Sequence, residues 1–172
     1  MSRRGGARSG SREENLTVAE VLEKYHDGPS SGVFTDGSCE PNPGPGGWGA
    51  VYVEDGEIVD EVCGHDPGTT NNRMELSALI HGYRLVPPGR PAVVWTDSQL
   101  CVNSITQWAA GWEKRGWKRK GGEIKNLELV QELYGLSKER PELELRWIKA
   151  HSGYRWNEYA DSLASAYRRS TK

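Results

Sequence analysis

Four acidic residues are candidates for a functional site because of their positions relative to the predicted strands and helices. Asp36 directly follows a short apolar run, and Asp97 directly follows the unbroken apolar run 92–96. A carboxylate that continues an apolar strand lies where open α/β sheets place their ligand sites, beyond the strand ends. Glu75 and Asp161 stand beside apolar helical stripes, so each helix can direct one carboxylate along the boundary between core and solvent. Taken singly, each is more simply explained as a helix cap, an Asx turn or a surface acid.

Taken together, the four carboxylates indicate metal chemistry. Four like charges that gather in space repel one another unless a cation neutralises them. Ligands that are all oxygen favour Mg²⁺ or Mn²⁺ over zinc. Such a cluster fits phosphoryl transfer at two metal ions better than glycoside hydrolysis, which needs only a pair of carboxylates.

The elements that must position these residues follow from hydrophobic periodicity and turn signals. A Pro/Gly loop is predicted over 39–47, and Asp55-Gly56 predicts a hairpin between the second and third strands. The fifth strand alternates, which predicts Leu143, Leu145 and Trp147 on one side. The order βββαβααβα predicts an α/β domain with a mixed five-stranded sheet flanked by helices. The predicted strands are 32–38, 48–54, 58–64, 92–96 and 143–148, and the predicted helices are 71–85, 98–112, 126–140 and 157–169.

The N-terminal part differs in composition from the rest. Residues 1–14 are mostly Arg, Gly and Ser without apolar periodicity, which predicts disorder. Thr17-x-x-Glu20 predicts a capping box at the start of a short amphipathic helix over about 17–26, followed by a linker. We therefore expect a basic leader at 1–31, a catalytic domain at 32–169 and a C-terminal end at 170–172. The leader's arginines could add nonspecific phosphate contacts, but a solubilising role is the simpler expectation.

Composition excludes several classes of protein. Nothing approaches 18 consecutive apolar residues, and no apolar segment follows the N-terminal arginines, so neither a membrane span nor a secretory signal is expected. Three cysteines without a CxxC pair are typical of a reducing compartment, and we expect the cytoplasm. The 172 residues carry 22 basic and 24 acidic side chains, a net charge of −2 that by itself disfavours a nucleic-acid partner. The charge is unevenly divided, however, because residues 113–125 hold six basic and two acidic side chains.

Five linked motifs contain the four carboxylates in chain order. They are Thr35-Asp36-Gly-Ser-Cys39, Asn42-Pro-Gly-Pro-Gly-Gly-Trp48-Gly, Thr70-Asn71-Asn72-Arg73-Met74-Glu75-Leu76, Trp95-Thr96-Asp97-Ser98-Gln99, and Lys149-Ala-His151-Ser-Gly153 with Asn157-Glu-Tyr-Ala-Asp161. Together they resemble type 1 ribonuclease H over about residues 32–167. The resemblance implies the RNase H-like fold, whose element order agrees with the pattern above.

The resemblance implies an endonuclease that hydrolyses the RNA strand of RNA/DNA hybrids by two-metal-ion catalysis, leaving 5′-phosphate and 3′-hydroxyl ends. It implies that Asp36 bridges two Mg²⁺ ions and that Asp161 joins the ion that activates water. Glu75 and Asp97 would join the ion that stabilises the leaving 3′ oxygen, and we expect Mn²⁺ to substitute for Mg²⁺. His151, in the loop after the fifth strand, is expected to transfer a proton or help the product leave, the alternative being a surface loop histidine.

The resemblance also implies a substrate interface in two parts. Short polar groups would read the RNA strand, which its 2′-hydroxyls mark, in the minor groove. The matching residues are Cys39, Asn42, Asn72 and Gln99. For Cys39 a small buried filler is an equal alternative, and Asn42 could instead be a turn residue.

The DNA strand would be held by an aromatic and basic excursion and by a phosphate pocket. Tryptophans interleaved with basic residues can hold sugars and phosphates, although core tryptophans beside a solvated charge run are the commoner case. Gly116, Gly121 and Gly122 favour a protruding excursion. Gly68 and Leu100 depart from the arginine and the aromatic residue that relatives often carry there, which weakens the expected grip. The residues assigned to this strand are Thr70, Asn126, Trp108, Trp112, Trp117, Lys114, Arg115 and Lys118.

Two other functional classes stay open from the sequence. A noncatalytic hybrid-binding module is disfavoured by the four intact carboxylates. A related fold acting in DNA strand transfer or DNA cleavage is disfavoured by His151, the basic excursion and the 2′-hydroxyl readers. We expect an RNA/DNA hybrid as substrate, a monomer and no contact with a membrane, and no protein partner can be inferred.

Overall fold

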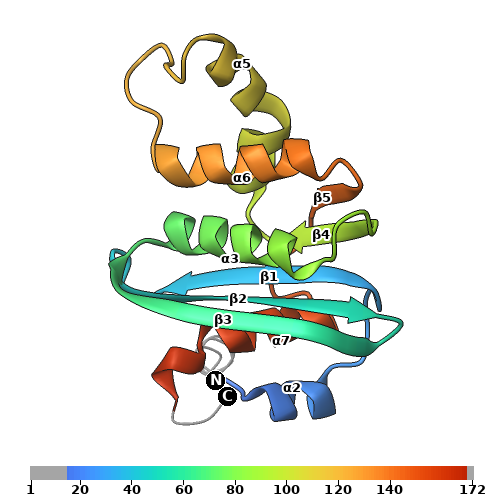
Figure 1. The fold of residues 1–172 in the computed structure, drawn as a ribbon. Coiled ribbons are helices and arrows are strands. Elements are labelled where there is room, and N and C mark those ends of the chain that lie inside the picture. The colour runs from blue at the N-terminus through green and yellow to red at the C-terminus, as the bar shows by residue number, and fades with distance from the viewer. Residues whose placement is uncertain (1–14, 170–172) are drawn as a thin grey trace, which may run out of the picture.

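The computed structural model describes residues 15–169 and contains one five-stranded sheet between two layers of helices (Figure 1). The strands β1 (Gly32–Cys39), β2 (Gly44–Glu54) and β3 (Glu57–Thr69) form an antiparallel meander. The strands β4 (Ala92–Thr96) and β5 (Leu143–Trp147) extend the sheet in parallel from β1, giving the order β3-β2-β1-β4-β5. The predicted mixed five-stranded α/β sheet is confirmed.

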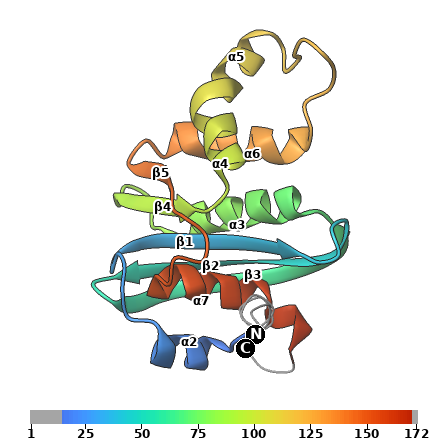
Figure 2. The same cartoon turned by 180° about the vertical axis from the view of Figure 1, so that it is seen from behind.

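Each face of the sheet is covered by helices that bury an apolar stripe. On one face, α3 (Asn71–Leu85) packs on the sheet and α6 (Leu127–Glu139) packs on α3, as Figures 1 and 2 show from opposite sides. On the other face lie α7 (Arg155–Ala164) and α2 (Val18–Lys24). The two resulting clusters are centred on residues such as Leu79 and Leu133 on the first face and Phe34 and Leu163 on the second. The sheet is thus fixed from both sides.

The predicted helix 98–112 is one continuous run with a change of pitch inside it. It consists of α4 (Gln99–Asn103), a π-helical segment η1 (Ser104–Trp108) and α5 (Ala109–Lys114). A π-helical turn accommodates an extra residue and often marks a functional position in a helix. Beyond α5, Gly116, Trp117, Gly121 and Gly122 have positive φ, and the chain stands away from the sheet at the top of Figure 1. The predicted protruding excursion therefore exists.

The predicted loop over 39–47 is wrong in most of its length. β1 and β2 continue to pair through Ser38 with Gly47 and Cys39 with Gly46, so only residues 40–43 lie outside the two strands. The glycines that indicate a loop locally have a packing role here. A Cβ on Gly47 would lie 2.2 Å from the carbonyl oxygen of Ala164, so glycine lets the C-terminal end of α7 contact the strand.

Other element ends also differ from the sequence prediction. β3 reaches Thr69 instead of residue 64. The last predicted helix, 157–169, begins two residues earlier as α7 and gives way after Ala164 to a short 3-10 turn, η2 (Ala166–Arg168). Trp147 is 46% exposed although it continues the Leu143 side of its strand, because β5 is an edge strand that ends at this residue. No helix within residues 15–169 has the length and apolarity to cross a bilayer.

Residues 15–31, which precede β1, are packed into the domain. The predicted capping box forms, with Thr17 N–H donating to Glu20 Oε1 at 2.8 Å and Glu20 N–H donating to Thr17 Oγ1 at 3.2 Å. Val21 of α2 is only 2% exposed and belongs to the core cluster under α7. The Ser162 hydroxyl of α7 donates to the Leu16 carbonyl at 2.6 Å. The packed core therefore reaches further toward the N-terminus than the predicted domain start at 32, while the predictions for 1–14 and 170–172 fall outside the described residues.

Candidate active site

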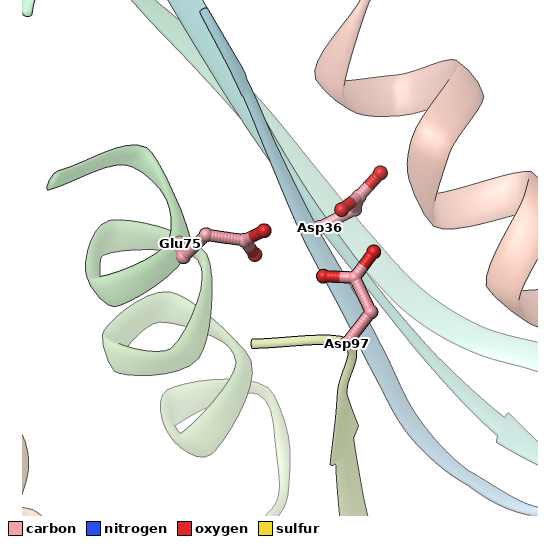
Figure 3. A group of neighbouring side chains, drawn as sticks. All are labelled: Asp36, Glu75 and Asp97. Carbon is pink, nitrogen blue, oxygen red and sulfur yellow. The ribbon is translucent and has the colours of Figure 1, made fainter. Parts of the chain in front are cut away.

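Asp36 and Asp97 are brought together by the parallel pairing of β1 with β4. Phe34 of β1 is in register with Trp95 of β4. Asp36 and Asp97, each two residues later in the sequence, therefore lie next to each other (Figure 3). Asp36 lies within β1 and is 7% exposed, whereas Asp97 directly follows the last residue of β4. The indole Nε1–H of Trp147 donates to the Asp97 carbonyl at 3.2 Å, so the end of β5 holds the backbone of Asp97 in place.

Glu75 reaches the same point because α3 touches the backbone of β1. A Cβ on Gly37 would lie 2.4 Å from Glu75 N and 2.5 Å from the Met74 carbonyl carbon, so only glycine allows this approach. The Gly37 backbone N–H lowers the pKa of Glu75 and so favours its charged carboxylate, against the larger effect of burial. The residue next to Asp36 thus determines where the helix carboxylate stands.

Asp161 is placed by a similar contact on the opposite face of the sheet. A Cβ on Gly49 of β2 would lie 2.5 Å from Leu163 Cβ and 2.9 Å from Ala164 N, so α7 lies directly on the strand. Asp161 lines the same cleft as Asp36, and its charge contributes to raising the pKa of Asp36. The four predicted carboxylates therefore converge from two strands and two helices.

The carboxylates of the cluster repel one another, and a cation would neutralise them. Burial, followed by the neighbouring carboxylates with Asp97 first, raises the pKa of Asp36 well above its ordinary value. Burial and then Asp97 raise the pKa of Glu75 well above its ordinary value as well. Both shifts have the same physical cause, because buried carboxylates that stand close together repel one another. A bound cation would remove this repulsion.

The geometry fits a divalent cation. Asp36, Glu75 and Asp97 each offer one carboxylate oxygen, and these oxygens lie within 4.8 Å of one another. Glu75 Oε1 is buried and has no hydrogen-bond partner among the described residues. Buried polar atoms without a partner are costly, so such an oxygen indicates a missing ligand. The donor set is all oxygen, which is what hard divalent cations prefer.

A cleft of 1090 Å³ opens above the cluster and gathers most of the predicted catalytic and RNA-strand residues. His151 lies on it in an exposed loop with a positive φ, and Ser152 stiffens that loop by donating to the Lys149 carbonyl at 2.6 Å. Asn42 is exposed, and its Oδ1 accepts from Asn71 N–H at 3.2 Å. The predicted residues on the cleft are Asp36, Cys39, Asn42, Asn72, Glu75, Asp97, His151 and Asp161.

Two of the predicted RNA-strand residues are engaged elsewhere. The Cys39 thiol is buried and donates toward the carbonyls of Pro41, Gly44 and Thr69 at 3.3–3.5 Å, which favours the filler alternative for its side chain. Gln99 does not line the cleft, and its amide donates to Asn103 Oδ1 at 3.2 Å along α4.

The basic excursion forms a second groove, of 510 Å³, on the other side of the first turn of α3. Trp108 and Trp112 line it with ring centroids 6.0 Å apart, and Trp108 is 39% exposed. Asn72 lines both this groove and the cleft. Other residues on the groove include Leu100, Arg115, Arg119, Lys120, Lys125 and Asn126.

Three residues of the basic excursion that were predicted for the DNA strand do not line this groove. Trp117 is partly buried and packs edge-on against Tyr134 with ring centroids 6.0 Å apart, so for this tryptophan the core alternative holds. Lys118 lines a neighbouring hollow with Trp117, and Lys114 is an exposed residue at the end of α5. Trp108, Trp112 and Arg115 are therefore the residues of the predicted excursion that the structure brings together on the groove.

Thr70 and Asn126, the predicted phosphate pair, are joined by a residue to which the sequence analysis gave no role. Thr70 caps α3 by accepting from Arg73 N–H at 3.2 Å. The Arg73 guanidinium donates to Asn126 Oδ1 at 3.2 Å and forms an ion pair with Glu128 at 2.8 Å. Asn126 has a left-handed backbone conformation, which asparagine tolerates well. Arg73 belongs to the motif 70–76. Its positive charge three residues after Thr70 is the feature of the sequence that could have indicated a role in binding phosphate.

The mixed sheet and the converging carboxylates define a class of protein, a nuclease with an acidic, cation-binding centre. Comparisons with known proteins narrow this class. The family model for RNase H matches residues 29–169. Ribonuclease HI of Caulobacter vibrioides is 45% identical over 140 residues, which cover 80% of this chain and 91% of that protein. Ribonuclease H of Hahella chejuensis is 45% identical over 136 residues, 77% of this chain and 89% of the relative.

Solved structures agree with the sequence relatives. LC9-RNase H1, described as a type 1 RNase H with the type 2 active-site motif, has a TM-score of 0.64 and 38% identity and covers 81% of this chain and 72% of its own. LC11-RNase H1, solved with an RNA/DNA hybrid, has a TM-score of 0.58 over 80% of this chain, and at 23% identity it supports the fold alone. The chain belongs to the RNase H family, whose members are metal-dependent endoribonucleases.

Proposed function

We propose that this chain hydrolyses the RNA strand of RNA/DNA hybrids with two Mg²⁺ ions and leaves 5′-phosphate and 3′-hydroxyl ends. The observation that carries the proposal is the buried carboxylate cluster with the unpartnered Glu75 Oε1, open to a cleft that shares Asn72 with an aromatic and basic groove. Membership of the RNase H family, with relatives 45% identical that are named ribonuclease H, supports the choice of substrate.

The four carboxylates are the groups that would hold the metal. Asp36 would be the central ligand, since its carboxylate lies with those of Glu75 and Asp97 and is also close enough to Asp161 for that charge to raise its pKa. Bound divalent ions supply a polarised phosphate, an activated water and a stabilised leaving oxygen. The rigid placement of the carboxylates by Gly37 and Gly49 fixes that geometry before substrate arrives. We expect Mn²⁺ to replace Mg²⁺ because both prefer oxygen ligands.

His151 is the candidate for proton transfer at the edge of the cleft. It is exposed and sits on a loop whose far end is fixed, because Arg155 N–H donates to the Asp27 carbonyl at 2.8 Å. An imidazole with access to solvent can exchange protons with water between turnovers. This position supports a role in protonating or releasing the product.

The substrate would lie across the first turn of α3. The RNA strand would enter the cleft, where Asn42 and Asn72 offer amide groups to 2′-hydroxyls. The DNA strand would follow the groove, with sugars against Trp108 and Trp112 and phosphates against Arg115. Thr70, Arg73 and Asn126 form the candidate phosphate pocket, and Arg73 provides it with a cation where Gly68 does not. A monomeric state and a cytoplasmic location stay predictions.

The experiment compares cleavage of an RNA/DNA hybrid, double-stranded RNA and double-stranded DNA, in Mg²⁺ and in EDTA. We expect cleavage of the hybrid alone, only with the metal, and its loss in Asp36→Asn with hybrid binding retained. Asp60→Asn, an exposed acid on β3, is the matched control and should cleave normally. Full turnover by Asp36→Asn, or cleavage in EDTA, would contradict the mechanism.

A further inference from the structure

The cleft over the carboxylates has an unusual balance of charge. Its described lining includes six acidic side chains and one arginine, Arg168. Divalent ions would neutralise the four clustered carboxylates but leave Glu40 and Glu158 facing an incoming polyanion. Arg168 is therefore the permanent cation of the protein on this lining. The acidic residues are Asp36, Glu40, Glu75, Asp97, Glu158 and Asp161.

Arg168 is held in place by two neighbours on the same side of the domain. One guanidinium nitrogen, Nη2, donates to Ser38 Oγ at 3.0 Å, and Nε–H donates to the Tyr167 hydroxyl at 3.1 Å. The guanidinium also lies over the Tyr167 ring, 5.3 Å from its centroid. Tyr167 is itself anchored, because its hydroxyl donates to the Pro45 carbonyl at 3.2 Å. A guanidinium fixed in this way loses little conformational entropy when it binds a ligand.

The anchor on Ser38 sets the distance from Arg168 to the cluster. Ser38 stands two residues after Asp36 on β1, so both side chains are on the same face of the pleated strand, about 7 Å apart. The guanidinium therefore lies beside the carboxylate cluster, on the side toward the 40–43 connection that carries Asn42. A strand that contacts both Asn42 and the carboxylates would pass close to this guanidinium.

Arg168 keeps hydrogen-bonding capacity for a ligand. A guanidinium has five N–H donors in a planar fork, and Ser38 and Tyr167 take two of them. The remaining nitrogen, Nη1, is 4.0 Å from Glu40, whose side chain is 76% exposed. An exposed ion pair at that distance contributes little and is readily exchanged for a stronger one. A phosphate offers the bidentate partner that arginine prefers.

We propose that Arg168 binds a phosphate of the RNA strand next to the scissile phosphate and so positions that strand over the carboxylates. The inference rests on the proposed function, because it takes the strand in the cleft to be the one that is cut. The DNA strand is not the candidate, since its groove lies on the other side of Asn72. Arg168 is a substrate-binding residue that no match to a motif indicated.

The first test separates binding from chemistry. In Arg168→Ala, KM for the hybrid should rise about tenfold, the effect of one charge-assisted contact, while kcat stays within about twofold. Binding is measured in the Asp36→Asn background so that substrate is not consumed. The slope of log binding constant against log salt concentration should become shallower by about 0.7–0.9, the value for one phosphate contact. Arg168→Lys should restore the slope but only part of the affinity. Arg90→Ala removes the same charge at the start of β4, from an ion pair with Glu54, and should change neither quantity.

The second test identifies the phosphate. A hybrid with one neutral methylphosphonate linkage in the RNA strand, adjacent to the cut, should abolish the difference in KM between wild type and Arg168→Ala. The same change in the DNA strand should preserve that difference.

The inference is overturned if KM and the salt slope are unchanged in Arg168→Ala, or if kcat and the melting temperature fall at constant KM. It is also overturned if the methylphosphonate in the DNA strand, and not the one in the RNA strand, abolishes the difference in KM. Failure of the wild-type protein to cleave any hybrid would instead remove the proposed function.

Discussion

Gly37 offers a direct test of how the fold places its catalytic carboxylates. In Gly37→Ala the new Cβ would lie 2.4 Å from Glu75 N, 2.5 Å from the Met74 carbonyl carbon and 2.9 Å from Glu75 Cα. All three are backbone atoms, which cannot rotate away as a side chain would. Ordinary contacts begin near 3.4 Å, so α3 and β1 must separate by about 1 Å. That displacement moves Glu75 directly away from Asp36.

The expected consequence is a large loss of activity with a moderate loss of stability. A misplacement of about 1 Å in a catalytic group can cost about 100-fold in rate, so we expect kcat to fall by that order. Forcing an extra carbon into a packed contact should lower the free energy of unfolding by about 1–3 kcal/mol, which leaves the protein folded.

The assay is steady-state cleavage of a fluorescent RNA/DNA hybrid, with a urea melt of each variant. Gly68→Ala is the matched control, because it lies just before the same helix and a Cβ there meets no atom within 4 Å. It should retain wild-type kcat and stability. A folded Gly37→Ala protein with kcat within about threefold of wild type would refute the reasoning.

Three further predictions concern stability. In EDTA, Asp36→Asn should raise the melting temperature by roughly 2–4 °C, equivalent to about 1 kcal/mol, because it removes a buried charge from beside three carboxylates. In Mg²⁺ the wild type should melt at the higher temperature, because only the wild type gains stability from the bound metal. A lower melting temperature of the variant in EDTA would contradict this. Val21→Ala should cost about 1–3 kcal/mol in a urea melt because Val21 is buried under α7, whereas Glu23→Ala on the exposed side of α2 should be neutral, and equal effects would show that α2 does not stabilise the domain. Gly135→Ala in α6 should stabilise the protein by about 1 kcal/mol, measured in the same melts, since its Cβ would meet no atom within 4 Å and alanine is the better helix former; a loss of stability would contradict the open space seen there.

Local signals predicted the elements whose ends are marked by local chemistry. α3 has the predicted bounds 71–85 because a threonine cap precedes it and a Pro-Pro-Gly sequence follows it. β4 has the predicted bounds 92–96 because an unbroken apolar run can only be a buried strand or a short helical segment, and five residues suit a strand. The positions of Glu75, Asp97 and Asp161 could be predicted because a strand end and the edges of helices follow from the same periodicity, whereas Asp36 lies within β1 and not at its end.

The features that were missed depend on contacts between distant segments. Glycine favours loops locally, so residues 44–47 were predicted as loop, although they belong to β2 and Gly47 contacts the end of α7. The Cys39 thiol points at three carbonyls, one of them 30 residues away in sequence, which no local pattern records. Arg168 contacts Ser38 across 130 residues, and Arg73 contacts Asn126 across 53. Such pairings appear only when the chain is folded.

Asn72, at the start of α3, lines both the cleft and the groove, so this helix fixes how far the two sites lie from each other. The carboxylates lie on one side of Asn72 and the aromatic groove on the other, and both are fixed to the same rigid helix. A duplex held on both sides must therefore extend past the cut in one direction far enough to reach Trp108. Cuts close to that end of a hybrid lose the DNA-strand contact, so the enzyme should leave an uncut remnant at one terminus and not at the other. The length of that remnant is set by how far Trp108 lies from the carboxylates along the bound duplex.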